Sequence, residues 1–477
     1  MVLRATDTKT KIVCTIGPST ERSETLRQLL REGMDVARIN FSHGTHAQHA
    51  ATIERIRAVA QEEGAVIAVM ADLQGPKLRL GELVEPLTLG VADWVSLTTL
   101  PANGSHHVLP LPHPELVAHA RPGQRLLLDD GEIELTVREA RPETLICQVA
   151  VGGRLMSHKG VAAPDGIVAV SAMTDKDRRD AAFAIEHGVE FVALSFVRSA
   201  EDIRELRELL DAANAEDVHI VAKIESRHAV ECLTDILPHA DAVMVARGDL
   251  GVELSPQEVP LHQKAIIREC NRAAIPVITA TQMLQSMIEN PRPTRAEASD
   301  VANAILDGTD AVMLSAETAV GRYPIEAVRM LRQISVEVEP HLPARLSDSG
   351  GAVEHVHPVT DAISDATARI AAELDIALIA TATWSGYTAR QIARKRPRQP
   401  IVAFTPQEIV QRQLALVWGV APLLVPASSS TDDLLNIVSR TLLSHGDAGP
   451  GDRIVLTGGV PVGGGGKTNF IKVHQIE

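Results

Sequence analysis

Eight short apolar runs, each ending in polar residues, constrain the fold of this chain more than any other feature. They are rich in Val, Ile and Ala and occupy residues 11–17, 35–42, 66–72, 190–196, 219–225, 241–249, 276–281 and 310–317. Nearly continuous apolar character is typical of strands buried on both faces of a parallel sheet. Amphipathic stretches with helical spacing lie between most of these runs. This alternation predicts an α/β protein built on a (β/α)8 TIM barrel, whose functional residues lie at the carboxyl ends of the strands.

Residues 74–162 interrupt this alternation. Helical spacing disappears there, and turns containing glycine and proline separate short alternating runs such as residues 132–139. This pattern predicts a small all-β domain inserted at the carboxyl end of the third barrel strand. An insert at that position would cover the active site as a lid. We therefore expect the barrel to comprise residues 1–73 and 163–343.

The last part of the chain returns to alternating strands and helices. A stretch at 341–357 has the composition of a linker, and five further apolar runs follow it, within 377–383, 400–405, 421–426, 452–458 and 470–476. The pattern predicts a separate open α/β domain, to which we assign residues 344–477.

Composition narrows the choice of partners and compartment. The net charge of -15 argues against nucleic acid or an acidic membrane surface as a partner. No apolar run reaches the length of about 18 residues that a membrane-spanning helix requires, and the N-terminus lacks the apolar core of a signal peptide. The four scattered cysteines indicate free thiols in a reducing compartment. We expect a cytoplasmic enzyme.

Charged residues end neighbouring strands of the predicted barrel. Glu225 ends the fifth apolar run and Asp249 ends the sixth, so their carboxylates are expected to converge on one Mg²⁺ or Mn²⁺ ion. Lys223 lies two residues before Glu225 and therefore on the same face of its strand. Arg38 lies at the end of the second run and Thr281 at the end of the seventh. Cations fixed around a metal ion are what phosphoryl transfer requires.

Several stretches resemble the pyruvate kinase family. They are "KIVCTIGPST", "ARINFSHG", "DLQGPKLRLG", "AKIES", "MVARGDLGVEL" and the long block at 279–318. The resemblance runs from residue 10 to about 330 and resumes in the last domain. It implies a glycolytic enzyme that transfers a phosphoryl group from phosphoenolpyruvate to ADP, giving pyruvate and ATP. It also implies dependence on Mg²⁺ and assembly into a homotetramer.

The resemblance also implies roles for single residues around the substrate. Arg38 would contact the phosphate of phosphoenolpyruvate, and Lys223 would stabilise the transferring phosphoryl group and the enolate. Glu225 and Asp249 would hold the divalent cation. The backbone N–H groups of Gly248 and Asp249 would bind the substrate carboxylate.

Two further sets of positions come from the same resemblance. Thr281 matches a residue of the network that protonates the enolate. The positions on the nucleotide side, for ADP or ATP, match Asn40, His43, Arg79 and Lys159.

One departure from the family pattern concerns a monovalent cation. Many members require K⁺ and read T-K-G-P-E-I-R where this chain has "LQGPKLR". The positions that match the K⁺ site are Asn40, Ser42, Asp72, Leu73 and Lys77. A leucine side chain cannot bind K⁺, and the Lys77 ammonium could supply the missing positive charge. The sequence therefore predicts catalysis without K⁺.

The last domain contains two stretches that resemble an effector site of regulated family members. In "TATWSGYT", the hydroxyls of Thr381, Thr383, Ser385 and Thr388 precede or begin a predicted helix and could bind a phosphorylated effector. The glycine-rich stretch 458–469 matches the family's effector loop. The alternative interpretation is that both are ordinary turns. The basic run "RKRPR" at 394–398 is expected to be a solvated helix end and turn, with binding of an effector phosphate as the alternative.

Two other functions are compatible with parts of the pattern. A metal-dependent lyase or aldolase that forms a pyruvate enolate on a related barrel would also use paired Glu and Asp ligands. It would need neither the β-rich insert nor the C-terminal domain. A catalytically inactive scaffold would not need the set of strand-end residues, which is intact in this chain.

Overall fold

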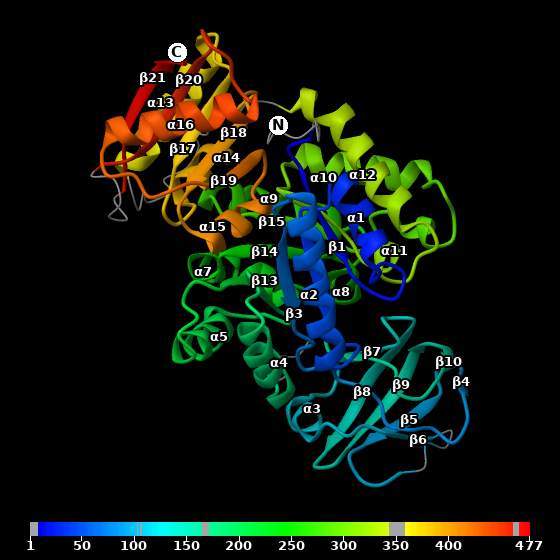
Figure 1. Cartoon of the computed structure of the whole chain (residues 1–477). Coiled ribbons are helices and arrows are strands. Elements are labelled where there is room, and N and C mark those ends of the chain that lie inside the picture. The colour runs from blue at the N-terminus through cyan, green and yellow to red at the C-terminus, as the bar shows by residue number, and fades with distance from the viewer. Residues whose placement is uncertain (1–7, 103, 105–106, 165–170, 343–357, 461–466) are drawn as a thin grey trace.

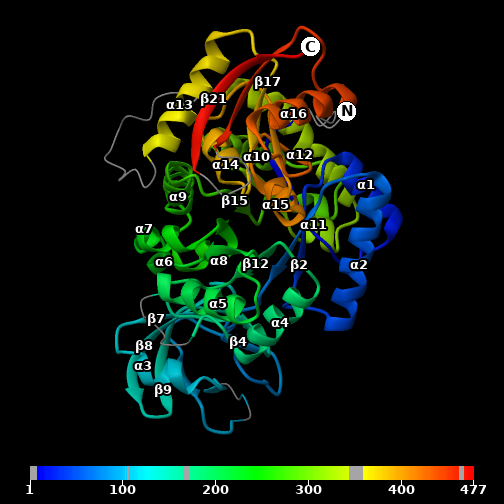
Figure 2. The same cartoon turned by 60° about the vertical axis from the view of Figure 1, so that its left-hand side comes forward.

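The chain folds into three parts that lie in a row, as seen in a computed structural model (Figures 1 and 2). The structure describes residues 8–102, 104, 107–164, 171–342, 358–460 and 467–477. A β/α barrel lies in the middle, with the inserted β-rich domain at one end and the C-terminal α/β domain at the other. The predicted fold class is confirmed. Within the described residues, no helix has both the length and the apolar character needed to cross a membrane.

Each of the eight apolar runs contains one strand of a closed parallel barrel. The strands are β1 (Lys11–Thr15), β2 (Val36–Asn40), β3 (Ala68–Asp72), β12 (Phe191–Leu194), β13 (His219–Ile224), β14 (Ala242–Ala246), β15 (Val277–Ala280) and β16 (Ala311–Leu314). Their order around the barrel is β1-β16-β15-β14-β13-β12-β3-β2. Because all strands are parallel, their carboxyl ends meet at a single rim.

Helices cover the outside of this barrel. They are α1 (Ser23–Glu32), α2 (His46–Glu63), α4 (Asp175–Glu186), α5 (Ala200–Ala212), α6 (Arg227–Glu231), α7 (Leu233–Ile236), α8 (Arg247–Glu253), α9 (Val259–Ala273), α10 (Arg295–Asp307), α11 (Ala316–Ala319) and α12 (Pro324–Val338). Successive strand residues point to opposite faces of the sheet. One set packs against the helices, and the other fills the barrel interior with small and large side chains such as Ala193, Ala242, Met70, Met244 and Phe191.

The inserted domain leaves the barrel after β3 and the chain returns at α4. Its strands are β4 (Leu87–Leu89), β5 (Trp94–Thr98), β6 (Val108–Pro110), β7 (Arg125–Leu128), β8 (Ile133–Arg141), β9 (Thr144–Val151), β10 (Gly153–Leu155) and β11 (Val161–Ala162). They form a six-stranded and a two-stranded sheet around their own apolar core. The short helix α3 (Pro114–His119) was not predicted from the sequence, and it makes the domain β-rich with one helix.

The C-terminal domain has all five predicted strands. They form one sheet in the order β19 (Val420–Leu424), β18 (Ile401–Thr405), β17 (Leu378–Ala382), β20 (Arg453–Gly459) and β21 (Thr468–Gln475). The helices α13 (Pro358–Glu373), α14 (Tyr387–Ala393), α15 (Glu408–Gln413) and α16 (Thr431–His445) complete the domain. The predicted boundary between residues 343 and 344 lies outside the described residues.

This domain closes the amino-terminal end of the barrel. Ala415 and Leu416 belong to the same buried cluster as the side chains of the barrel interior. They come from the one-turn helix η4 (Leu414–Leu416). Gln413, just before them, donates a hydrogen bond of 2.6 Å to the carbonyl of Asp217. The barrel core therefore continues into the C-terminal domain.

The prediction that the basic run 394–398 is solvated was wrong for Arg396. Its side chain is 1% exposed and forms an ion pair of 3.0 Å with Asp310, just before β16. The same guanidinium donates to the side chain of Asn271 and the carbonyl of Gly308, and it lies over the ring of Trp418. Arg396 therefore pairs across the domain interface, whereas Arg394 and Lys395 pair with Asp361 and Asp365 of helix α13 in the same domain. The sequence pattern did not show which residues lie opposite it.

We predict that Arg396→Ala destabilises the protein by about 3–5 kcal/mol, because it leaves the buried Asp310 carboxylate without its cation. Chemical denaturation of the purified protein, followed by circular dichroism, would measure this loss. Arg398→Ala is the matched control, since Arg398 is exposed in the same segment and should change stability by less than about 0.5 kcal/mol. Equal stability of the two variants would contradict the prediction.

Candidate active site

A buried carboxylate at the end of β3 joins two cations from other strands. Asp72 is 1% exposed, and its Oδ2 accepts a hydrogen bond of 2.6 Å from Nε of Arg38 on β2. Its Oδ1 lies 3.2 Å from Nζ of Lys223 on β13. Burial acts to raise the pKa of Asp72, but the two cations outweigh burial and hold that pKa below its ordinary value. The predicted convergence of Arg38 and Lys223 at one rim is therefore present, and Asp72 connects them.

Three oxygen atoms surround the ammonium group of Lys223. Besides Asp72, they are Oε1 of Glu225 at 2.9 Å and Oγ of Ser195 at 2.6 Å. Burial acts to lower the pKa of Lys223, but the carboxylates of Asp72 and Glu225 outweigh it and raise the pKa above its ordinary value. Lys223 is thus held as a fixed cation.

Glu225 and Asp249 line one cavity, as the metal prediction requires. Oε2 of Glu225 accepts a hydrogen bond of 2.7 Å from the backbone N–H of Phe196. Burial and the charge of Asp249 raise the pKa of Glu225 above its ordinary value, although Lys223 opposes them. The described residues contain no group of three or more His, Cys, Asp or Glu that could hold a metal. Two converging carboxylates that repel each other nevertheless fit an oxygen-liganded divalent cation.

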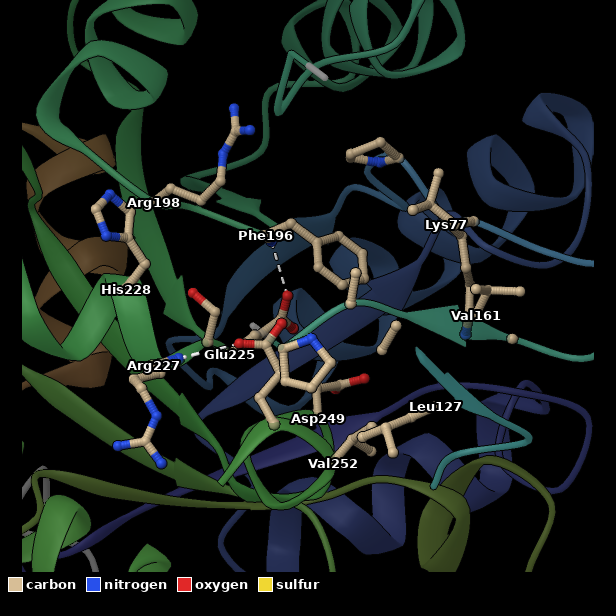
Figure 3. Close-up of a pocket in the computed structure, with 18 of the residues that line it drawn as sticks. Lys77, Leu127, Val161, Phe196, Arg198, Glu225, Arg227, His228, Asp249 and Val252 are labelled. Carbon is tan, nitrogen blue, oxygen red and sulfur yellow. Dashed lines mark hydrogen bonds between the residues drawn. The ribbon is translucent and has the colours of Figure 1, made fainter. Parts of the chain in front are cut away.

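The cavity has a volume of about 490 Å³ and lies between the barrel rim and the inserted domain. Figure 3 shows Glu225 and Asp249 at its base, between Lys77 and Val161 on one side and Arg227 on the other. Leu127 and Val161 bring apolar surface from the inserted domain. A small molecule in this space would contact both domains.

The ends of β14 and β15 are joined through Thr281. Its Oγ1 accepts a hydrogen bond of 2.7 Å from the backbone N–H of Gly248, the group predicted to bind the substrate carboxylate. Thr281 has a φ of 66°, a conformation that is uncommon for a residue other than glycine. Arg247 supports this turn: its Nη2 donates to the carbonyl of Thr281, and its Nη1 pairs with Asp300. The first turn of helix α8 is thereby held against the end of β15.

The four predicted nucleotide-side residues belong to two different domains. Asn40 ends β2 and accepts a hydrogen bond from the backbone N–H of Ser42, and His43 is exposed beside them. Arg79 and Lys159 belong to the inserted domain. Arg79 donates to the carbonyl of His158, and the ammonium of Lys159 lies 2.7 Å from Asp129.

Of the predicted monovalent-cation remnant, Asp72 ends β3, Leu73 follows it, and Asn40 is the partner of Asp72 in the register of β2 and β3. The Leu73 side chain is buried, and its carbonyl accepts the hydroxyl hydrogen of Ser195 at 2.7 Å. The cationic partners of Asp72 are Arg38 and Lys223. Lys77 is exposed on the cavity wall instead.

The predicted effector residues lie in the C-terminal domain, and most of their side chains are buried. Thr381, Thr383 and Thr388 are buried, and Oγ1 of Thr388 lies 2.7 Å from Oγ1 of Thr468. Ser385 is exposed. Within the glycine-rich stretch 458–469, residues 461–466 lie outside the described part of the chain.

Two hydroxyl groups that touch the rim cations were not predicted from the sequence. Ser195 follows β12 and contacts Lys223, and Thr15 ends β1 and accepts a hydrogen bond of 2.8 Å from Nη1 of Arg38. Both are polar residues at the end of an apolar run, which is the same signal that identified Glu225 and Asp249. The signal was present, but serine and threonine are too common at strand ends to stand out.

Comparison with known proteins finds one family along nearly the whole chain. Residues 7–328 match the model described as "Pyruvate kinase, barrel domain", and residues 361–474 match "Pyruvate kinase, alpha/beta domain". The chain is 46% identical over 471 residues to a pyruvate kinase of Geobacillus stearothermophilus, and 44% identical over 471 residues to one of Sporosarcina psychrophila. Both matches cover 98% of this chain and 80% of the relative. A crystal structure of a pyruvate kinase from Cryptosporidium parvum superposes with a TM-score of 0.92 at 33% identity, over 99% of this chain and 97% of that one.

The pKa of Glu253, another carboxylate that lines the cavity, differs from the ordinary value of a glutamate. Burial raises its pKa to about 7, although the backbone N–H of Arg227 donates to it. An unfolded glutamate keeps its ordinary, lower pKa. The stability that the Glu253 carboxyl group contributes is therefore fully present below that ordinary pKa. This contribution is lost as the pH rises through about 7.

We predict that Glu253→Gln removes this pH dependence. In buffer containing EDTA, the variant should be more stable than the original protein by about 1–3 kcal/mol at pH 8 and equal to it near pH 4.5. Denaturant titrations at several pH values would measure the difference. Glu231→Gln, an exposed change in the wall of the same cavity, is the control and should give no gain at either pH. A constant difference between Glu253→Gln and the original protein across the range would rule the assignment out.

Proposed function

The chain belongs to the pyruvate kinase family, and from that membership we propose a Mg²⁺- or Mn²⁺-dependent, K⁺-independent enzyme of cytoplasmic glycolysis. It is a phosphotransferase with phosphoenolpyruvate and ADP as substrates and pyruvate and ATP as products. The observation that supports the proposed site most directly is the rim network. This network consists of Arg38 on β2, Asp72 on β3, Lys223 on β13 and Glu225 directly after β13. These four residues form one connected set of ion pairs.

Glu225 and Asp249 are the residues that would hold the divalent cation. Among the predicted site residues at the rim, three are carboxylates, Asp72, Glu225 and Asp249, and the two cations beside them are Arg38 and Lys223. This excess of negative charge, together with the raised pKa of Glu225, favours a bound cation. When bound, Mg²⁺ would neutralise charge on the phosphoryl oxygens and on the developing enolate.

Lys223 and Arg38 supply the fixed positive charge of the reaction. The guanidinium of Arg38 is suited to bind the phosphate of phosphoenolpyruvate. Lys223 is positioned beside the metal ligands, where its ammonium stabilises the phosphoryl group in flight and the enolate left behind. Both cations are held in place by Asp72, a group of the protein itself, which limits the reorganisation that the reaction requires.

The turn at Gly248 and Thr281 would bind the carboxylate end of phosphoenolpyruvate. The N–H of Gly248 is bonded to the Thr281 hydroxyl, so an incoming carboxylate would compete for this donor and release the hydroxyl. Thr281 then lies where the network that protonates the enolate is expected. We assign residues 74–162 to a lid that brings Arg79 and Lys159 towards the nucleotide. Asn40 and His43 would contact the nucleotide from the rim.

The surroundings of Asp72 support catalysis without K⁺. In this chain Asp72 has two cationic neighbours, and the buried Leu73 side chain has no atom that can bind K⁺. Lys77 adds an ammonium group to the wall of the cavity that Glu225 and Asp249 line. We propose that these charges replace the monovalent cation.

In the C-terminal domain, we propose that a phosphorylated effector binds near the exposed Ser385. We also propose that the assembly is a homotetramer. A pyruvate-enolate lyase or aldolase is not favoured by the comparisons.

Lys223→Met is expected to preserve the fold and to lower kcat by about a thousandfold or more, because a charge that stabilises the transition state is lost. Steady-state kinetics at saturating phosphoenolpyruvate would measure the change. Lys264→Met, which removes an exposed lysine of helix α9, serves as the control and should keep normal turnover. Normal turnover of a folded Lys223→Met protein would refute the role given to Lys223.

A coupled assay that monitors pyruvate formed from phosphoenolpyruvate and ADP tests the whole proposal. We expect turnover with Mg²⁺ alone, loss of turnover with EDTA, and less than a twofold change when KCl is added to K⁺-free buffer. A large increase on addition of KCl would overturn K⁺ independence. Absence of pyruvate under every condition would overturn the proposed activity.

A further inference from the structure

The two catalytic cations are each bonded to a buried hydroxyl, and the two hydroxyls make the same set of contacts. We propose that Thr15 and Ser195 are paired positioning residues that fix the directions of Arg38 and Lys223. Each hydroxyl lies at the end of a barrel strand, accepts a hydrogen bond from the cation of one neighbouring strand, and donates to a backbone carbonyl at the end of the other. This inference rests on the proposed function, because it assigns its effect to phosphoryl transfer.

Ser195 connects β3 with β13 across the end of β12. Its hydroxyl donates to the carbonyl of Leu73 at 2.7 Å and accepts from Nζ of Lys223 at 2.6 Å. Strand β12 lies between β3 and β13 in the barrel, so Ser195 is placed to reach both. The residue is buried, which excludes water as a competing partner.

Thr15 makes the same arrangement on the other side of the rim. Its hydroxyl donates to the carbonyl of Leu314 at 2.9 Å and accepts from Nη1 of Arg38 at 2.8 Å. Strand β1 lies between β16 and β2, which carry these two partners. The side chain of Thr15 is buried as well.

A hydroxyl has a single hydrogen, and this gives each contact a direction. Because that hydrogen is used by a backbone carbonyl that cannot move away from the strand, the lone pairs must face the cation. The cation can therefore only donate. The carbonyls belong to the barrel backbone. The hydroxyls therefore hold the two charged groups at fixed positions relative to the strand ends.

The arrangement matters most for Lys223, whose other two contacts are carboxylates. Glu225 is a proposed metal ligand, and its contact with Lys223 would be weaker if its oxygens also held a cation. Ser195 is then the contact that keeps the ammonium from moving towards Asp72. Without the hydroxyl, we expect the ammonium to shift away from the reacting group, and a displacement of about 1 Å can cost a hundredfold in rate.

Three variants test the proposal in the full-length enzyme. Ser195→Ala should lower kcat about 10- to 100-fold with little change in KM for phosphoenolpyruvate, because Lys223 acts in the transition state. Thr15→Val, which has nearly the same shape, should raise that KM about tenfold, because Arg38 binds the phosphate in substrate and transition state alike. Thr15→Ser keeps the hydroxyl and should stay within about threefold of the original enzyme.

A matched control separates positioning from a general loss of packing. Thr309 also has a buried hydroxyl whose single hydrogen lies between two strand carbonyls, of Val277 and Ala311, each 3.0 Å from Oγ1, but at the opposite end of the barrel. Thr309→Val should lower the melting temperature and leave kcat and KM within twofold. Ser195→Ala made in the Lys223→Met background should cause no further loss of kcat, since the group that it positions is absent.

The outcomes are distinct. Values of kcat and KM within twofold of the original enzyme in both Ser195→Ala and Thr15→Val would overturn the proposal, as would equal losses in Thr309→Val. If Thr15→Val does not fold, Ser195→Ala and its double variant decide the question alone. Failure of the proposed function would appear differently, as absence of turnover in the unaltered protein.

Discussion

The buried carboxylate of Asp72 is the constraint on which the rest of the rim depends. Two cations of this size and charge repel each other, and neither would be stable in a buried site without an anion between them. Asp72 lies at the end of β3, where it reaches Arg38 on the adjacent strand β2 and Lys223 on β13, two strands away on the other side. The closed barrel makes this possible, because it brings residues far apart in the chain to neighbouring points on one circle.

Preorganisation explains why so many polar groups are buried at one place in an otherwise aliphatic core. The contacts of Lys223 are made with groups of the protein itself, and the same holds for the turn around Thr281. Groups that are already oriented stabilise developing charge without a reorganisation cost, which is the main way in which protein catalysts assist phosphoryl transfer. The cost of burying these charges is met by the apolar helices and strands around the barrel.

Much of the fold and part of the site were accessible from sequence because both depend on local patterns. An apolar run ending in Glu225 or Asp249 predicts a strand and its functional end at once. The partners of these residues were not accessible in this way. The pairing of Asp72 with Arg38 and Lys223 depends on which strands become neighbours. The pairing of Arg396 with Asp310 depends on how the domains dock. The exposure of Thr381 and Thr388 was not accessible either: both are buried, since hydroxyls close in sequence to a helix start need not face solvent.

The continuation of the barrel core into the C-terminal domain has a consequence for how this molecule can be divided. Ala415 and Leu416 complete an apolar interior whose other members come from the eight barrel strands. A fragment that ended after helix α12 would present the open bottom of that interior to water, and Asp310 would lose its guanidinium partner. The inserted domain has a core of its own, so among the described residues it is the more separable unit to exchange. Recombination among relatives should therefore tolerate breakpoints beside the insert and penalise those that separate the barrel from the C-terminal domain.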